Sequence, residues 1–320
     1  MSMLLETKHL KKYFNTPRGL LHAVDDVNIA VPQGSTLGVV GESGCGKSTL
    51  GRTVLRLLEA TSGEVLFEGK DVTKMNKQEL ATFRNQAQII FQDPYASLNP
   101  RMTVSEIIAE PLIAGHLCHS KAEIEQRVFK MMDTVGLASR MINTYPHELD
   151  GGRRQRIGIA RALVLEPKFV VCDEPVSALD VSIQAQILNL LMDLQRDHGL
   201  TYMFITHDLS VVKHISTEIA VMYLGCCVER GPAKEIFANP LHPYTKALLA
   251  AIPVPDLSRR GMKREILTGE VSSPIDPKPG CRFAARCPYA TESCHSGDIP
   301  LADYGNGHFC ACRMCKSGKD

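Results

Sequence analysis

The sequence lacks three features, and each absence excludes a class of protein. No run of 18 apolar residues occurs, so we expect no membrane-spanning helix. No charged-then-apolar segment opens the chain, so we expect no secretory signal. No charge of one sign dominates, with 36 basic and 35 acidic side chains, and this balance gives no electrostatic argument for a nucleic-acid partner. We therefore expect a cytosolic protein that can still dock on a membrane partner.

Cysteine, in contrast, is abundant. The chain of 320 residues holds 11 cysteines, and those at positions 281, 287, 294, 310, 312 and 315 lie close together near its end. In a reducing compartment such a cluster favours metal binding over disulfides.

The strongest single motif is the stretch Gly41–Ser48, which fits the phosphate-binding pattern GxxxxGK[ST]. The apolar run Thr36–Val40 before it predicts a buried strand, and apolar residues at helical spacing follow it. Glycines let the backbone approach a ligand, and the free amides of a helix N-terminus favour an anion. We expect Lys47 to reach the β- and γ-phosphates and Ser48 to bind Mg²⁺. The predicted nucleotide contacts are Gly41, Glu42, Ser43, Gly44, Cys45, Gly46, Lys47, Ser48 and Thr49.

Two aromatic residues stand out in residues 1–35, which are expected to be rich in strands. Tyr13 and Phe14 end a strand-like run that starts at Leu10, and Ala23–Val31 alternates as another strand. A flat apolar ring is suited to stack on adenine, so either aromatic residue is a candidate for that contact. Packing in a core is the alternative role for both rings.

Polar side chains end three further apolar runs that predict buried strands. Gln92 follows the first, Asp173 and Glu174 end the second, and His207 follows the third. Ligands of α/β proteins bind where parallel strands end. Asp173 is suited to hold a metal, Glu174 to polarise an attacking water, and His207 to contact a γ-phosphate. Gln92 is suited to bind Mg²⁺ or to position water.

A helical block runs from Val104 to Val164. Within it, Leu149–Arg156 forms a Gly-Gly turn that opens a helix, and Asp150 is placed to be the N-cap. Taken alone, this octet predicts only a capped and basic helix start.

Together these motifs come in the order seen in ABC-transporter ATPase domains, and the resemblance covers about residues 5–232. It implies an α/β fold with a RecA-like core, a β-rich N-terminal subdomain and a helical signature subdomain at about 93–165. It implies catalytic roles for Glu174, His207, Gln92 and Lys47, and Mg²⁺ ligands at Ser48, Gln92 and Asp173. It places ATP between two such chains, with Asp150, Gly151 and Gly152 of one chain on the γ-phosphate held by the other, and Asp180 at the dimer interface.

Three longer stretches resemble, more narrowly, the ATPases of dipeptide and oligopeptide importers. They are Phe91–Arg101, His242–Leu249 and Gly280–Cys287. The resemblance implies an ATP-hydrolysing subunit on the cytoplasmic face of the membrane, a second ATPase subunit and two transmembrane permeases. An extracytoplasmic solute-binding protein would feed the permeases, and no nucleic acid would take part. The same subgroup includes nickel importers, which keeps nickel open as an alternative solute.

Two positions of the octet depart from the family pattern. The octet of the family has serine where this chain has Asp150, and glutamine where it has Arg153. A carboxylate about 4 Å from a phosphate charge is repelled by roughly 4 kcal/mol at an effective dielectric near 20. Arg153 offsets part of this repulsion. We therefore predict a heterodimer with a second, non-identical ATPase, in which Asp150 makes the partner's site the weaker one.

Past Pro232 the cassette is expected to end, so we divide the chain into an ATPase domain over 1–232 and a C-terminal extension over 233–320. The run Val271–Pro279 resembles a linker, and cysteines follow it. Cys281, Cys287, Cys294 and Cys310 match the pattern by which several importer ATPases bind a 4Fe–4S cluster. Zinc and the absence of a metal are the alternatives, and Cys312 and Cys315 are either competing ligands or free thiols.

Three rival classes are weighed against this assignment. A chromosome-maintenance ATPase needs long heptad repeats between the phosphate loop and Asp173, and none occur. A translation or repair ATPase that binds nucleic acid has tandem cassettes, whereas one phosphate loop is present here. A non-hydrolysing structural partner is disfavoured because Glu174 and His207 are both in place.

Overall fold

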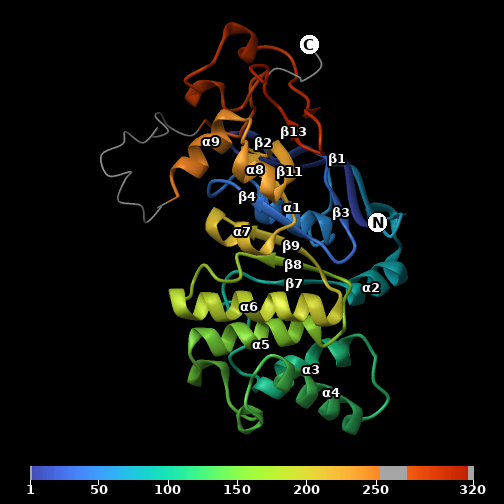
Figure 1. Cartoon of the computed structure of the whole chain (residues 1–320). Coiled ribbons are helices and arrows are strands. Elements are labelled where there is room, and N and C mark those ends of the chain that lie inside the picture. The colour runs from blue at the N-terminus through green and yellow to red at the C-terminus, as the bar shows by residue number, and fades with distance from the viewer. Residues whose placement is uncertain (1, 253–271, 316–320) are drawn as a thin grey trace, which may run out of the picture. The chain divides into compact units, whose positions relative to one another are not determined.

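The computed structural model describes residues 2–252 and 272–315 (Figure 1). The chain forms two compact units, each described by itself. The helical unit contains Val31–Ser35 and Lys74–Ile205, with the first residues of the chain. The phosphate-loop unit contains Leu5–Ala30, Thr36–Thr73 and the chain from Thr206 onward. Across the described residues, no helix has both the length and the apolar character needed to cross a bilayer.

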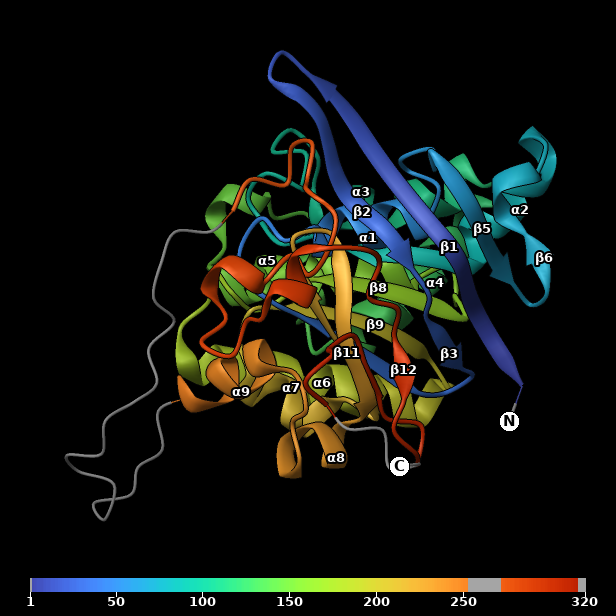
Figure 2. The ribbon, with the colours of Figure 1, turned by 90° about the horizontal axis from the view of Figure 1, so that it is seen from above.

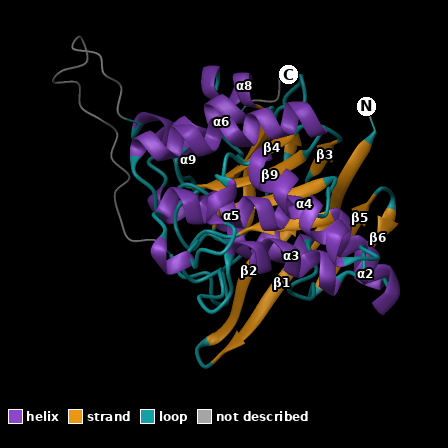
Figure 3. Cartoon of the chain, turned by 90° about the horizontal axis from the view of Figure 1, so that it is seen from below, coloured by secondary structure: helices purple, strands orange, loops and turns teal. Residues whose placement is uncertain are grey.

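The helical unit is built on three parallel strands in the order β9-β8-β7. β8 is buried along its whole length, as expected for a parallel strand covered on both faces. Helices α5 and α6 lie side by side against this sheet, and α3 and α4 pack on α5 (Figures 1 and 3). The strands are β7 (Ala87–Ile90), β8 (Phe169–Asp173) and β9 (Thr201–Thr206). The helices are α2 (Lys77–Gln86), α3 (Val104–Ala114), α4 (Lys121–Thr134), α5 (Gly151–Leu163) and α6 (Val181–His198), with short 3₁₀ turns at Ser139–Met141 and Pro146–Glu148.

The phosphate-loop unit holds an antiparallel sheet in the order β2-β1-β5-β6. β1 and β2 form its long hairpin (Figure 2). The strands are β1 (Met3–Thr16), β2 (Gly19–Val27), β5 (Ser62–Phe67) and β6 (Lys70–Asp71). The short strand β3 (Ala30–Pro32) falls mostly within the stretch Val31–Ser35 of the helical unit. The predicted strand Ala23–Val31 is thus interrupted after Val27.

A second group of strands in this unit has the order β12-β13-β11-β10-β4, in which β4 and β10 are parallel. They are β4 (Thr36–Val40), β10 (Glu218–Tyr223), β11 (Cys226–Pro232), β12 (Ala302–Asp303) and β13 (Phe309–Cys310). The helices are α1 (Lys47–Val54), α7 (Leu209–Ile215), α8 (Ala233–Ala238) and α9 (Pro243–Ala250), with 3₁₀ turns at Val72–Lys74, Ala284–Arg286 and Glu292–His295.

The stretch predicted as a linker, described here over residues 272–279, forms backbone hydrogen bonds with β2. The amide of His22 donates to the Pro274 carbonyl at 3.0 Å, and the amide of Asp276 donates to the Leu20 carbonyl at 2.9 Å. Leu21 and Ile275 form a β-bridge. The linker prediction was therefore wrong for these residues, because the backbone beside the prolines continues the edge of the hairpin. Val271 lies outside the described residues.

Aromatic side chains form the core beneath the C-terminal part of this unit. Tyr223 of β10 makes edge contacts with Tyr244 of α9 at 4.7 Å and with Phe283 at 5.3 Å between ring centroids. All three rings are at most 1% exposed. They pack with Val40 of β4 in one cluster, so the residues from 280 onward share a core with the strand that precedes the phosphate loop.

Candidate functional site

The phosphate loop has the geometry that its glycines predict. Gly46 has φ of 104°, and a Cβ built there would lie 1.9 Å from the Ala23 carbonyl oxygen. At Gly41, with φ of 150°, a Cβ would lie 2.2 Å from the Met222 carbonyl oxygen. The loop thus runs in backbone contact with β2 and β10, where only glycine fits. Helix α1 begins at Lys47 with no side-chain cap among the described residues, which leaves first-turn amides for a ligand.

Lys47 is held inside the loop. Its side chain is 4% exposed, and its Nζ donates to the carbonyl oxygens of Gly41 at 2.8 Å and Glu42 at 3.0 Å. A buried ammonium needs such partners. The arrangement places a fixed positive charge within the loop, which is the chemistry that a polyphosphate requires.

Glu42 is anchored by residues far along the chain. Its amide donates to the Tyr244 hydroxyl at 2.8 Å, and its carboxylate accepts two hydrogen bonds from the guanidinium of Arg286. Neither anchor was predicted from the sequence. Both lie in stretches whose only sequence signal is the family resemblance, and no local pattern pairs residues separated by 244 positions.

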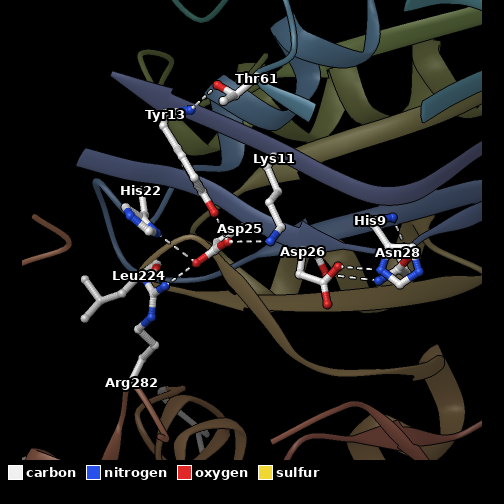
Figure 4. Close-up of polar contacts among 10 residues, drawn as sticks. All are labelled: His9, Lys11, Tyr13, His22, Asp25, Asp26, Asn28, Thr61, Leu224 and Arg282. Atoms are coloured by element: carbon white, nitrogen blue, oxygen red, sulfur yellow. Dashed lines mark hydrogen bonds and ion pairs between the residues drawn. The ribbon is translucent and has the colours of Figure 1, made fainter. Parts of the chain in front are cut away.

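Tyr13 and Phe14, the two candidates for stacking on adenine, have different surroundings on the β1–β2 hairpin. Tyr13 stacks on His22 of β2 at 3.9 Å between ring centroids, and its hydroxyl donates to Asp25 (Figure 4). Phe14 is the next residue, so it faces the other side of the strand, where the Lys12 amine lies 4.8 Å from its ring centroid. One face of the Tyr13 ring is therefore already covered within the protein.

Asp25 is the centre of this network. His22 Nδ1 lies 3.0 Å from Asp25 Oδ2, and Arg282 forms an ion pair with the same oxygen (Figure 4). Burial alone would raise the pKa of the Asp25 carboxyl, but the hydrogen bonds from His22 and Tyr13 and the charge of Arg282 hold it below its usual value. Burial and the hydrogen bond to Asp25 raise the pKa of Tyr13, which keeps its hydroxyl a donor.

In the helical unit, the predicted site residues Gln92 and Glu174 contact each other where strands β7 and β8 end. Asp173 ends β8 at 1% exposure, and Glu174 follows it with φ of 47°. The Glu174 amide donates to the Ile205 carbonyl at 2.9 Å, and Gln92 Nε2 donates to Glu174 Oε2 at 2.9 Å. A glutamate rarely adopts this left-handed conformation, and such strain clusters at functional sites. The backbone thus turns Glu174 away from the direction of Asp173 and toward Gln92.

The Gly-Gly octet opens α5 as predicted, with Asp150 as the N-cap. Asp150 Oδ1 accepts from the Arg153 amide at 2.8 Å, and Asp150 Oδ2 lies 3.2 Å from Arg153 Nη1. Arg153 thus pairs with the Asp150 carboxylate, although both side chains are about half exposed and the pair is weak. A Cβ at Gly152 would lie 2.7 Å from Ile183 of α6, so close helix packing requires this glycine.

His207 lies directly after β9, in the phosphate-loop unit. Its side chain is exposed, and the next residue, Asp208, caps α7 by accepting from the Ser210 amide at 2.8 Å. The predicted position at a strand end is confirmed. The contact with a γ-phosphate stays a prediction.

The four cysteines predicted as cluster ligands do not lie together. Cys281, Cys287 and Cys294 line one small cavity with Cys312, whereas the Cys310 sulfur lies 3.7 Å from that of Cys315. Cys310 is buried on β13, which pairs with β11, and its role as the fourth ligand stays a prediction. Across the described residues, no three histidine, cysteine or acidic side chains converge closely enough to hold a metal.

The cavity between these cysteines does not fit a cluster in the described conformation. Its volume is about 10 Å³, which leaves room for about one water molecule and not for an iron–sulfur cluster. Burial raises the pKa of the Cys281 thiol to about 11, so this thiol is protonated at neutral pH. Within residues 2–252 and 272–315, the structure therefore supplies closely packed thiols and no preformed metal centre.

A glycine phosphate loop before α1, a carboxylate pair after β8 and a Gly-Gly turn at α5 define an ATP-binding cassette of the ABC class. A family model described as ABC transporter matches residues 24–177. A solved dimeric ATP-binding cassette bound to ADP and Pi is similar, with 28% identity, a TM-score of 0.66, and cover of 72% of this chain and 98% of that one. The structure of cbiO1 from Clostridium perfringens is also similar, with 28% identity, a TM-score of 0.66, and cover of 75% and 92%. The chain is thus an ABC-type ATPase.

The C-terminal part of the chain identifies a narrower family within the ABC class. A family model described as oligopeptide/dipeptide transporter, C-terminal region, matches residues 228–294. The oligopeptide transport ATP-binding protein OppF of Salmonella typhimurium is 56% identical over 290 residues, which cover 90% of this chain and 87% of that protein. OppF of Bacillus subtilis is 60% identical over 254 residues, which cover 79% and 83%. The dipeptide transport ATP-binding protein DppF of Haemophilus influenzae is 50% identical over 317 residues, which cover 97% and 96%. The chain belongs to the family of ATP-binding subunits of oligopeptide and dipeptide ABC transporters.

Proposed function

We propose that this subunit hydrolyses ATP to power the import of oligopeptides or dipeptides, bound to two permeases at the cytoplasmic face of the membrane. The names of its relatives support a peptide solute. The observation that carries the catalytic half of the proposal is the contact of Gln92 with Glu174 beside the buried Asp173. A carboxylate held by a glutamine at the end of a core strand is suited to polarise a water for attack on a phosphate.

Each predicted site residue has a proposed role. The loop Gly41–Thr49 binds the phosphates, with Lys47 at the β- and γ-phosphates, and Glu174 is the general base. His207 contacts the γ-phosphate. Phe14 or Tyr13 stacks on adenine, since His22 covers one face of the Tyr13 ring and the Lys12 amine lies over one face of the Phe14 ring. The oxygens of Ser48, Gln92 and Asp173 are the ligand type that Mg²⁺ prefers, and a bound Mg²⁺ would neutralise phosphate charge.

Replacement of Glu174 by glutamine tests the catalytic assignment. The variant keeps the size of the side chain and loses the base, so we expect ATP turnover to fall by about 10²–10⁴-fold while ATP binding is retained. The measurement is peptide-stimulated ATP hydrolysis by the complex with its permeases in lipid vesicles. The matched control is Glu166→Gln, which changes an acidic residue of the same unit that also has positive φ and lies outside the site. Normal turnover by Glu174→Gln would reject the role of Glu174 and reopen the non-hydrolysing alternative.

The same complex tests the solute. We expect turnover to rise with di- and oligopeptides and not with nickel, because the relatives are named for peptide transport. Stimulation by nickel alone would instead support the nickel alternative. A nucleic-acid function is not supported, because these relatives are transport proteins and the charge is balanced.

A heterodimer with a second ATPase is also proposed. The support is Asp150, whose carboxylate at the first turn of α5 stands where the family pattern has a serine hydroxyl. Arg153 compensates this charge only weakly, since both side chains are solvated. A site capped by Asp150 would be the weaker of the two, whereas the phosphate loop of this chain would be completed by the octet of its partner.

The 4Fe–4S cluster remains a proposal based on the spacing of the cysteines. The proposed ligands are Cys281, Cys287, Cys294 and Cys310. Cys312 is the competing ligand, because it lines one cavity with the first three. Anaerobic purification tests the proposal, and absorption near 400 nm with bound iron is the expected result. Comparison of Cys310→Ser with Cys312→Ser identifies the fourth ligand, because replacement of a true ligand removes this absorption. Stoichiometric zinc without iron, or no metal, would reject the cluster.

A further inference from the structure

Two arginines in the stretch Gly280–Cys287 reach into the nucleotide-binding part of the phosphate-loop unit. Arg286 ends a short 3₁₀ turn and contacts the phosphate loop. Arg282, four residues earlier, contacts the Asp25 network on the hairpin (Figure 4). Neither arginine was among the site residues predicted from the sequence.

Arg286 binds Glu42 with both arms of its guanidinium. Its Nη1 lies 2.9 Å from Glu42 Oε2, and its Nη2 lies 3.1 Å from Glu42 Oε1. The arginine side chain is 7% exposed and that of Glu42 27% exposed, so water screens the pair only in part. Such a two-pronged contact fixes the direction of the carboxylate as well as its charge, which lysine cannot reproduce.

The same loop residue is held through its backbone. The Tyr244 hydroxyl accepts from the Glu42 amide at 2.8 Å, and the Tyr223 hydroxyl lies 3.4 Å from Arg286 Nη1. Both tyrosines belong to the buried aromatic core. Glu42 is therefore positioned by a rigid support whose parts come from β10, α9 and the turn before Cys287.

The charge of Glu42 makes this support relevant to ATP. Its carboxylate stands in a loop whose amides and lysine are arranged for an anion, so an uncompensated Glu42 would repel the phosphates. The ion pair cancels that charge and directs the carboxylate toward Arg286 rather than toward Lys47. Lys47 Nζ accordingly contacts the Glu42 carbonyl oxygen.

We propose that Arg286 is a positioning residue for ATP binding: it neutralises and orients Glu42 so that the phosphate loop accepts the triphosphate. The C-terminal region is thus part of the nucleotide site rather than an appendage to it. The proposal rests on the proposed role of the loop Gly41–Thr49.

A double-mutant cycle on the full chain, assembled with its permeases, tests the proposal. We expect Arg286→Gln to weaken binding of a fluorescent ATP analogue about tenfold, because a bare carboxylate then faces the phosphates. The KM for ATP should rise by a similar factor while kcat changes less than about twofold, as for a loss of uniform binding. Arg286→Lys should recover part of the affinity, because lysine restores the charge without the fork.

The decisive variant is Glu42→Gln combined with Arg286→Gln. Removing the carboxylate should return ATP affinity to within about twofold of Glu42→Gln alone, since the repelling charge is gone. A purely structural role of Arg286 would leave the double variant as weak as Arg286→Gln and would overturn the proposal. Thermal unfolding of each variant identifies those that fail to fold.

Arg313 supplies the matched control. It lies in the same C-terminal region, is exposed, and donates to the Ser296 carbonyl at 2.8 Å. Arg313→Gln should bind the analogue as the wild type does, and equal effects of Arg313→Gln and Arg286→Gln would also overturn the proposal. If the phosphate loop were not the ATP site, Lys47→Ala would bind the analogue normally, which separates that failure from a failure of the Arg286 proposal.

Discussion

At the scale of single residues, the glycines of the phosphate loop are not equivalent. Gly46 and Gly44 both have positive φ, at 104° and 77°. A Cβ at Gly46 would collide with the Ala23 carbonyl, whereas a Cβ at Gly44 would meet nothing within 4 Å. Position 46 therefore needs glycine for both space and conformation, whereas position 44 needs it for conformation alone.

The corresponding prediction compares Gly46→Ala with Gly44→Ala. Gly44→Ala should cost about 1–2 kcal/mol of stability from its left-handed conformation and keep ATP binding. Gly46→Ala should abolish ATP binding, because the loop or β2 must move to admit the methyl group. Equilibrium binding of ATP and denaturant unfolding of both variants are the measurements. Similar behaviour of the two variants would contradict the clash.

At the scale of elements, the local predictions from the sequence were good. The strand before the phosphate loop, the strands that end at Asp173 and Thr206, and the N-cap at Asp150 are all confirmed. Each rests on neighbouring residues: apolar runs, a glycine loop, or a side chain able to cap a helix. The domain boundary at residue 232 and the catalytic roles stay predictions.

What the sequence did not predict depends on distant contacts. Arg286 meets Glu42 across 244 positions, and nothing in either neighbourhood specifies the other. The grouping of the cysteines depends on distant contacts in the same way. Six cysteines lie near one another in the sequence, but spacing alone did not show that Cys312 shares a cavity with Cys281, Cys287 and Cys294. Tyr13 and Phe14 were separated only by the register that sets Tyr13 opposite His22.

The prediction at the scale of elements concerns the N-cap of helix α5. Asp150→Ser should leave stability within about 0.5 kcal/mol, because serine and aspartate are comparable N-caps. In the assembled dimer it should about double ATP turnover, since a hydroxyl replaces a repelling charge at the second site. Asp150→Asn, which keeps the cap without the charge, serves as the control for repulsion alone. Unchanged turnover and dimer closure in Asp150→Ser would contradict the asymmetric pair.

At the scale of the whole molecule, a buried polar centre ties the C-terminal region to β11. The Glu229 carboxylate is fully buried and accepts from the amides of Leu241 and His242 at 2.8 and 2.9 Å, and its Oε1 lies 2.7 Å from His308 Nε2. Burial would raise the pKa of Glu229, but these hydrogen bonds, chiefly that of His308, hold it below its usual value. The carboxylate therefore stabilises the fold above its unfolded pKa, and this contribution is lost on acidification.

His242 gives the pH prediction. Burial lowers its pKa to about 4, whereas an unfolded histidine titrates near 6.5. Between these values the unfolded chain binds more protons, so stability falls as the pH falls. From pH 6.5 to 5 we expect His242 to account for a loss of about 2 kcal/mol. His242→Asn, which retains an N-cap acceptor for the Tyr244 amide, should flatten this dependence in denaturant unfolding at the two pH values. An equally steep dependence in the variant would show that other groups cause it.

The two arginines before and within the 3₁₀ turn at Ala284–Arg286 have a practical consequence. A chain cut before Gly280 would retain the whole predicted cassette and would still lose the guanidinium groups that face Asp25 and Glu42. ATP affinities measured on such a trimmed cassette would then describe a site with two altered carboxylates. Proteins prepared for nucleotide assays on this subunit, and on relatives with both arginines, should therefore extend through the C-terminal cysteines.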